Sequence, residues 1–96
     1  MEIGNALLEA HKIVNGERQD QYGRPENSFS TIGTLWTAYL GRAITPHDVA
    51  VMLALMKVGR IMNGMKHDNY VDAAAYIALA ADMVDSMEEP ALKDKE

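Results

Sequence analysis

The strongest helix signal in the chain lies at residues 45–63, which read TPHDVAVMLALMKVGRIMN. Its opening residues, Thr45–Asp48, supply a capping hydroxyl, a proline at the first helical position and a carboxylate that can return the capping bond. The run Val49–Met56 is apolar on nearly every side, which is typical of a helix buried against several neighbours. Because Asn63-Gly64 is a stop signal, we expect this helix to run from about Pro46 to Met62.

Three further helices are expected around this one. Apolar residues at i, i+3, i+4 and i+7 between Ile3 and Val14 indicate an amphipathic helix. A second should run from about Ser28 to Leu40, with Asn27 or Ser28 as its cap. An alanine-rich helix should run from about Tyr70 to Met87, with Asp68 or Asn69 as its cap. Without β-alternation or repeats, the pattern predicts an all-α fold, a small four-helix bundle.

The length of 96 residues indicates one domain, which we place at residues 1–88, with a frayed tail at 89–96. A chain of this size buries only ~60–65% of the surface that its unfolded form exposes. Small alanines in one helix and apolar residues all round another also favour contact with a further subunit. We therefore expect the bundle to be completed by homo-oligomerisation, as a dimer or a tetramer.

Composition excludes several classes of function. Nine basic residues against 14 acidic ones give a net charge of −5, the wrong sign for general nucleic-acid binding. There is no cysteine, and hence no disulfide framework or thiol nucleophile. The longest apolar runs, Val49–Met56 and Ala73–Ala81, are far shorter than the ~20 residues that span a bilayer. The start of the chain does not resemble a signal peptide, so we expect no membrane association and a cytoplasmic location.

Two charged groups stand out in otherwise apolar helices. Lys57 and Arg60 are three residues apart and so share one helix face, where they can bind phosphate oxygens. The alternative is that they only stabilise the negative end of the helix dipole. Asp68, Asn69 and Asp72 offer oxygen ligands of the kind that suit Mg²⁺, although acidic residues at a helix start are also favoured by the dipole alone.

Two tyrosines complete the candidate ligand site. Tyr76 follows Asp72 by one helical turn. Tyr22, in the loop before Pro25, can stack on a base or serve as an interface anchor. Trp36 is expected in the core.

Three stretches carry a resemblance to known proteins: QYGRPENSFSTIGTLWTAYLG at 21–41, ITPHDVAVMLALMKVGRI at 44–61 and HDNYVDAAAYIALAADM at 67–83. Over roughly residues 17–85 the chain resembles short, functionally uncharacterised bacteriophage and prophage proteins. It is more distantly similar to a nucleotide-modification-associated helical family and, through it, to the MazG-like all-α nucleoside triphosphate pyrophosphatases.

The distant resemblance implies a helical dimer or tetramer that holds Mg²⁺ through acidic side chains from two helices. Asp68, Asn69 and Asp72 would stand at the second acidic motif, and Lys57 and Arg60 at the phosphate contacts. The first acidic motif, Glu-x-x-Glu, is missing, because residues 49–56 contain no acid. The catalytic residues are therefore unknown, and whether the protein is an enzyme stays open.

The resulting hypothesis is a phage or prophage protein, in the host cytoplasm, that binds a nucleotide or another phosphorylated small molecule. Mg²⁺-dependent pyrophosphatase activity would be an extension of this function. The alternative is a non-catalytic interaction or counter-defence protein that sequesters a host signalling nucleotide or binds a host protein. A purely structural dimer is the third hypothesis, and it predicts that Lys57 and Asp72 pair with each other.

Overall fold

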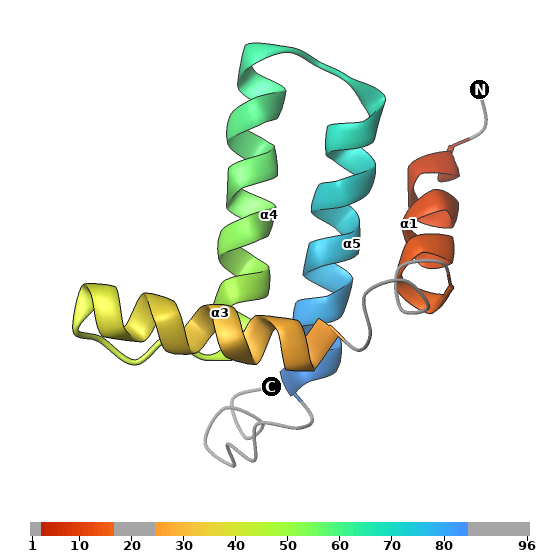
Figure 1. Cartoon of the computed structure of the whole chain (residues 1–96). Helices are drawn as coiled ribbons and strands as arrows, with labels where there is room; N and C mark the ends of the chain where they lie inside the picture. The colour runs from red at the N-terminus through yellow and green to blue at the C-terminus, as the bar shows by residue number, and fades with distance from the viewer. Residues whose placement is uncertain (1–2, 17–24, 85–96) are drawn as a thin grey trace, which may run out of the picture.

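The computed structural model describes residues 3–16 and 25–84, and the regular structure of these residues is entirely helical (Figure 1). The four helices are α1 (Asn5–Asn15), α3 (Pro25–Leu40), α4 (Pro46–Asn63) and α5 (His67–Val84). The prediction of an all-α, four-helix fold is confirmed. The tail at 89–96 lies outside the described residues, as does the boundary of the domain at residue 88.

The centre of the fold is the antiparallel hairpin of α4 and α5, whose helices are joined by residues 64–66 (Figure 1). Helix α1 packs along the other side of α5, close to the end that follows the hairpin turn. Helix α3 lies across the start of α4, nearly at right angles to the hairpin, and extends beyond α4 on the side away from α5. Of the helices in residues 3–16 and 25–84, none lies along the side of α4 that faces away from α5.

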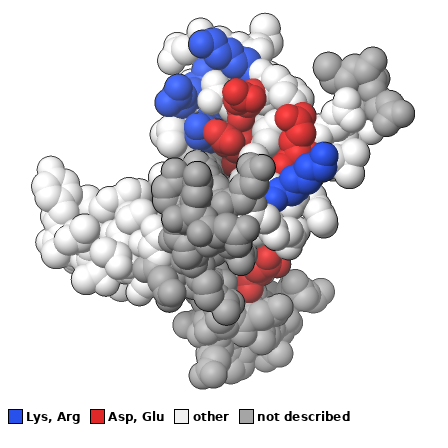
Figure 2. All heavy atoms as spheres, turned by 45° about the vertical axis from the view of Figure 1, so that its right-hand side comes forward, with Lys and Arg blue, Asp and Glu red and all other residues white. Residues whose placement is uncertain are grey.

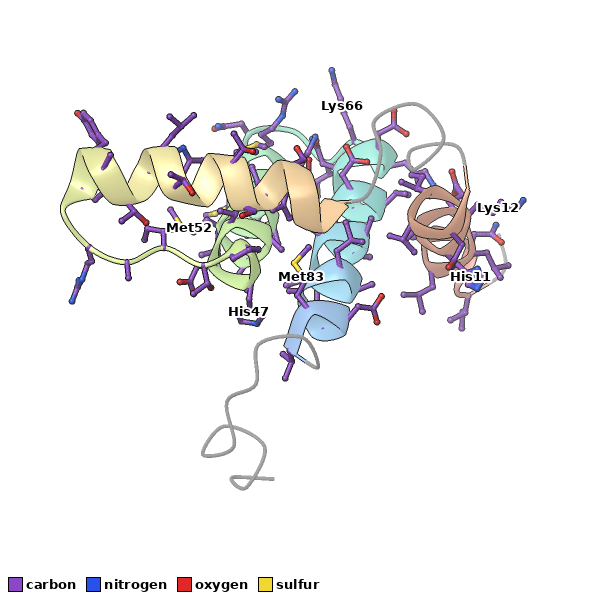
Figure 3. The ribbon with its side chains drawn as sticks, turned by 60° about the horizontal axis from the view of Figure 1, so that its bottom comes forward. His11, Lys12, His47, Met52, Lys66 and Met83 are labelled. Atoms are coloured by element: carbon purple, nitrogen blue, oxygen red, sulfur yellow. The ribbon has the colours of Figure 1, made fainter. Side chains whose placement is uncertain are left out.

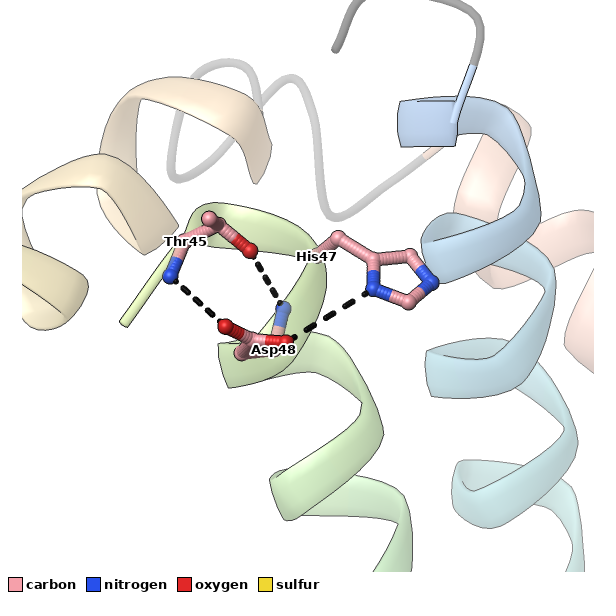
Figure 4. Close-up of polar contacts among 3 residues, drawn as sticks. All are labelled: Thr45, His47 and Asp48. Carbon is pink, nitrogen blue, oxygen red and sulfur yellow. Dashed lines mark hydrogen bonds and ion pairs between the residues drawn. The ribbon is translucent and has the colours of Figure 1, made fainter. Parts of the chain in front are cut away.

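The start of α4 has the expected reciprocal cap (Figure 4). The Asp48 backbone N–H donates to the Thr45 hydroxyl at 3.1 Å, and the Thr45 N–H donates to the Asp48 carboxylate at 3.0 Å. His47 lies beside the same carboxylate, with Nδ1 3.9 Å from Oδ1. These bonds satisfy backbone N–H groups that would otherwise lack a partner at the start of the helix. They therefore stabilise the beginning of α4 after the connection from α3.

Two expected helix starts were wrong. Helix α3 begins at Pro25, so Asn27 and Ser28 lie inside its first turn and not at its cap. Proline needs no hydrogen-bond partner for its nitrogen and has the right φ for a first turn, which allows the earlier start. Helix α5 begins at His67, so neither Asp68 nor Asn69 caps it. The Asn69 N–H donates to the Lys66 carbonyl at 3.1 Å, which closes the first turn before either side chain is needed.

The core is small and forms two clusters. The larger lies where α3 crosses the hairpin, around Phe29, Val49, Ala50, Ala80 and Met83, and Trp36 packs against it as expected. Figure 3 shows Met83 between α4 and α5. The second cluster joins α1 to α5 through Ala10, Val71 and Ala75. Among the residues that the structure describes, five of the nine buried hydrophobic ones are alanines, so the helices approach closely but little apolar surface is buried.

The expectation that the apolar run Val49–Met56 is buried against several neighbours holds only in part for the single chain. Val49, Ala50 and Ala54 are buried, but Met52, Leu55, Met56 and Met62 are exposed. The reason is topological, because α5 and α3 together cover only part of the surface of α4. Within the described residues, no helix is long and apolar enough to cross a membrane.

Candidate functional site

Charged side chains gather at the end of the hairpin where α4 meets α5, and they continue toward α1 (Figure 2). These side chains come from the last turns of α4, the connection 64–66, the first turns of α5 and the middle of α1. We call the surface formed by these charged residues the charged face. It comprises the contacting pairs Lys57–Asp72 and Glu9–His67, together with Arg60, Lys66 and Asp68, which lie at the same end of the hairpin by their positions in the chain.

The predicted residues Lys57 and Asp72 meet across the hairpin. The Lys57 Nζ lies 2.8 Å from an Asp72 carboxylate oxygen, and the two side chains are 14% and 26% exposed. Partial burial removes much of the water that would screen the two charges. Each charge is therefore stabilised mainly by the other, and removing one would leave its partner uncompensated. A lysine ammonium has three N–H donors, and this contact uses one of them.

The other predicted phosphate and metal residues are less enclosed. Arg60 and Asp68 are exposed, whereas Asn69 is 7% exposed and packs into the hairpin. The part of the chain that the structure describes contains no group of three or more His, Asp or Glu side chains that could hold a metal ion. Asp68 and Asp72 are thus two carboxylates on one helix, and Asp72 is already paired with Lys57. Their role as magnesium ligands stays a prediction.

Of the two candidate tyrosines, Tyr76 lies within the described residues. Tyr76 is half-buried and packs against the larger core cluster, with its ring centre 6.3 Å from that of Phe29. It therefore has a packing role, and contact with a ligand stays a prediction. Tyr22 lies outside the described residues.

A contact between Glu9 and His67 joins α1 to the charged face, and sequence reasoning missed it. The His67 Nε2 and the Glu9 carboxylate form a short hydrogen bond on the surface. That hydrogen bond and the Glu9 charge raise the pKa of His67 above its ordinary value, and the charge of Asp68 adds to the effect. The two residues are 58 positions apart, so no helical spacing could have connected them.

The fold and site define a small all-helical domain built on a hairpin with a charged end. The chain belongs to the family described as a domain of unknown function, DUF6378, whose model matches residues 5–84. No solved structure matches the chain significantly.

Two curated phage proteins are similar to the chain. It is 43% identical to the Gene 55 protein of Mycobacterium phage L5 over 79 residues, which are 80% of this chain and 51% of that protein. It is 38% identical to the Gene 55 protein of Mycobacterium phage D29 over 71 residues, which are 73% of this chain and 47% of that protein. The chain thus spans about half the length of these relatives. The expected kinship with uncharacterised phage proteins is confirmed.

Proposed function

We propose that the charged face binds a phosphorylated small molecule, with a nucleotide as the ligand class. The observation that carries the proposal is the largely buried Lys57–Asp72 pair on the charged face, between two helices whose buried residues are otherwise mostly apolar. Replacing such a pair by apolar residues is often neutral or stabilising. Folding therefore gives little reason to have it, whereas a binding site does.

The geometry suggests how a phosphate would be held. Arg60 and Lys66 are exposed and can donate to phosphate oxygens, Arg60 through its planar fork. The Lys57 ammonium can add one of its remaining donors. Asp72 would then position Lys57 by holding it at the surface of the hairpin.

Magnesium does not fit this arrangement as a resident ion. A metal held by the protein alone would need ligands beyond Asp68 and the already paired Asp72, and the described residues supply no such cluster. Mg²⁺ is commonly held by one or two carboxylates together with substrate phosphates, so an ion arriving with the nucleotide agrees with the proposal. The MazG-like resemblance supports the same ligand class, but we derive no hydrolytic step from these residues.

Calorimetric titration of the full chain tests the proposal. The probes are nucleoside triphosphates and inorganic triphosphate, each with and without Mg²⁺. We expect Arg60→Gln and Lys57→Met to weaken binding by about tenfold or more, which corresponds to about 1.4 kcal/mol. The matched control is Arg42→Gln, which removes an exposed arginine from the connection between α3 and α4 and should leave affinity unchanged. Absence of heat with every probe, or equal affinity in Arg60→Gln and Arg42→Gln, would contradict the proposal.

A second candidate, a purely structural dimer, is favoured by one specific observation. Lys57 and Asp72 neutralise each other within one chain, as the structural hypothesis predicts. Assay of pyrophosphate release from a nucleotide panel with Mg²⁺, beside a binding assay, separates the candidates. A pyrophosphatase releases pyrophosphate, and a sequestering protein binds without release. A structural dimer, or a protein that binds only a host protein, does neither.

A further inference from the structure

The side of α4 that faces away from α5 carries a continuous apolar stripe. Its members are spaced by three, one, three and three residues, which places them on one helix face: Met52, Leu55, Met56, Gly59 and Met62. All five are exposed. Figure 3 shows Met52 on the side of α4 that is turned away from α5. We call these five residues the outer stripe.

The end of α3 adds further exposed apolar residues. Figure 1 shows that α3 extends beyond α4 on the side away from α5. Tyr39 and Leu40, the last two residues of α3, are both exposed. Apolar residues of two nearly perpendicular helices are therefore exposed on this side of the hairpin.

Gly59 lies in the middle of this face, and nothing in the described part of its own chain explains it. Glycine is among the poorest helix formers, and a Cβ at this position would meet no atom of residues 3–16 and 25–84 within 4 Å. Gly33 is different, because a Cβ there would lie 2.7 Å from the Ile44 carbonyl oxygen. A glycine on an exposed helix face is expected where another backbone or a large side chain approaches closely.

The spacing of the outer stripe is self-complementary. If two copies of α4 pack antiparallel around an axis midway between Leu55 and Gly59, Leu55 meets Gly59 of the partner subunit, and Met52 meets Met62 of the partner subunit. A two-fold axis repeats each contact, so a large residue faces a small one twice. Lys57 is on the other side of α4, toward α5, so the Lys57–Asp72 pair lies outside such an interface.

The exposed apolar area also suits a second copy. A monomer seldom exposes an apolar patch larger than a few hundred Å², and a standard interface takes about 800 Å² from each partner. The outer stripe with Tyr39 and Leu40 presents six large apolar side chains, whereas Val49 is the only large one that the described residues bury completely. We propose that the outer stripe is the interface of a two-fold homodimer, in which Leu55 packs against Gly59 of the partner subunit. This inference does not depend on the proposed ligand.

Sedimentation equilibrium of the full chain tests the inference. We expect a mass of twice 10.6 kDa for the wild type. Leu55→Glu should yield a monomer with unchanged helix content, since Leu55 is exposed in the single chain. The matched control is Ile77→Glu, an exposed apolar residue on α5, which should stay dimeric. A monomeric wild type, or dissociation by Ile77→Glu but not by Leu55→Glu, would overturn the inference.

The Leu55–Gly59 contact has its own test. Gly59→Leu places two large residues opposite each other and should raise the dissociation constant at least tenfold. Adding Leu55→Ala restores a large–small pair and should recover at least part of that loss. If Gly59→Leu leaves the dissociation constant unchanged, or Leu55→Ala fails to recover any of the loss, the proposed register is wrong.

Discussion

The two faces of α4 differ in exposure and in charge. Ala54 and Leu55 are adjacent in sequence, yet Ala54 is 3% exposed and Leu55 is 63% exposed. The covered side of α4, its inner face, carries Ala50 and Ala54, the larger Val49 and Leu53, and Lys57, which pairs with Asp72 of α5. The outer face carries large apolar side chains around a single glycine. Large apolar residues thus lie on both sides of α4, and the proposed dimer would cover those that the single chain leaves exposed.

The largest expected effect comes from placing the same carboxylate on each face. Ala54→Asp buries a charge without a partner between α4 and α5, which should cost about 3–5 kcal/mol and prevent folding. Leu55→Asp places the charge on the outer stripe, where the chain should keep its helix content and lose only its partner. Circular dichroism and urea unfolding compare the two. Equal loss of helix in both variants would show that the faces do not differ in this way.

The next largest effect concerns the ion pair on the inner face. Lys57→Met or Asp72→Leu alone leaves the other charge half-buried and unpaired, and should destabilise the fold by about 1–3 kcal/mol. The double variant removes both charges and should approach wild-type stability. Urea unfolding of the four proteins forms a double-mutant cycle. A double variant as unstable as the sum of the single ones would mean that the pair is not coupled.

Gly33 and Gly59 compare a helical glycine that another segment of the chain contacts with one on the exposed face of α4. In a monomeric Leu55→Glu background, Gly33→Ala should destabilise by about 1–3 kcal/mol, because its Cβ would press on the Ile44 carbonyl oxygen. In the same background Gly59→Ala should stabilise by about 0.5–1 kcal/mol through better helix propensity. Thermal unfolding measures both. A destabilising Gly59→Ala in this monomer would reveal a neighbour within its own chain.

The smallest effect is the pH dependence of the surface pair between α1 and α5. The pKa of His67 is raised in the folded chain, chiefly by its hydrogen bond to Glu9. The stabilisation is therefore complete below the ordinary histidine pKa of about 6.5 and is lost as pH rises through the higher folded value. An NMR titration should show the raised pKa of His67, and Glu9→Gln should lower it.

Local signals in the sequence predicted much of the fold. The Thr45–Asp48 cap, the end of one helix at Leu40 and the class of fold all follow from neighbouring residues. The starts of α3 and α5 did not follow, because Pro25 can begin a helix as well as precede one and because Asn69 is buried and does not cap. Such choices depend on packing with other helices, which single-sequence patterns do not contain.

The candidate site was predictable only in part, for a related reason. Helical spacing placed Lys57 and Arg60 on one helix and Asp68 and Asp72 on the next. The structural hypothesis predicts that Lys57 pairs with Asp72, and the hairpin geometry brings the two side chains together. The Glu9–His67 contact depends on where α1 packs, which nothing in either local sequence indicates.

Methionine methyl NMR with a soluble paramagnetic agent tests the contrast between the faces of α4 most directly. Met62 on the outer stripe and Met65 in the hairpin turn are both 83% exposed in the single chain, and Met83 in the core is 2% exposed. If the outer stripe is a dimer interface, the agent should broaden the Met65 methyl signal and spare Met62 nearly as much as Met83. Equal broadening of Met62 and Met65 would contradict the account.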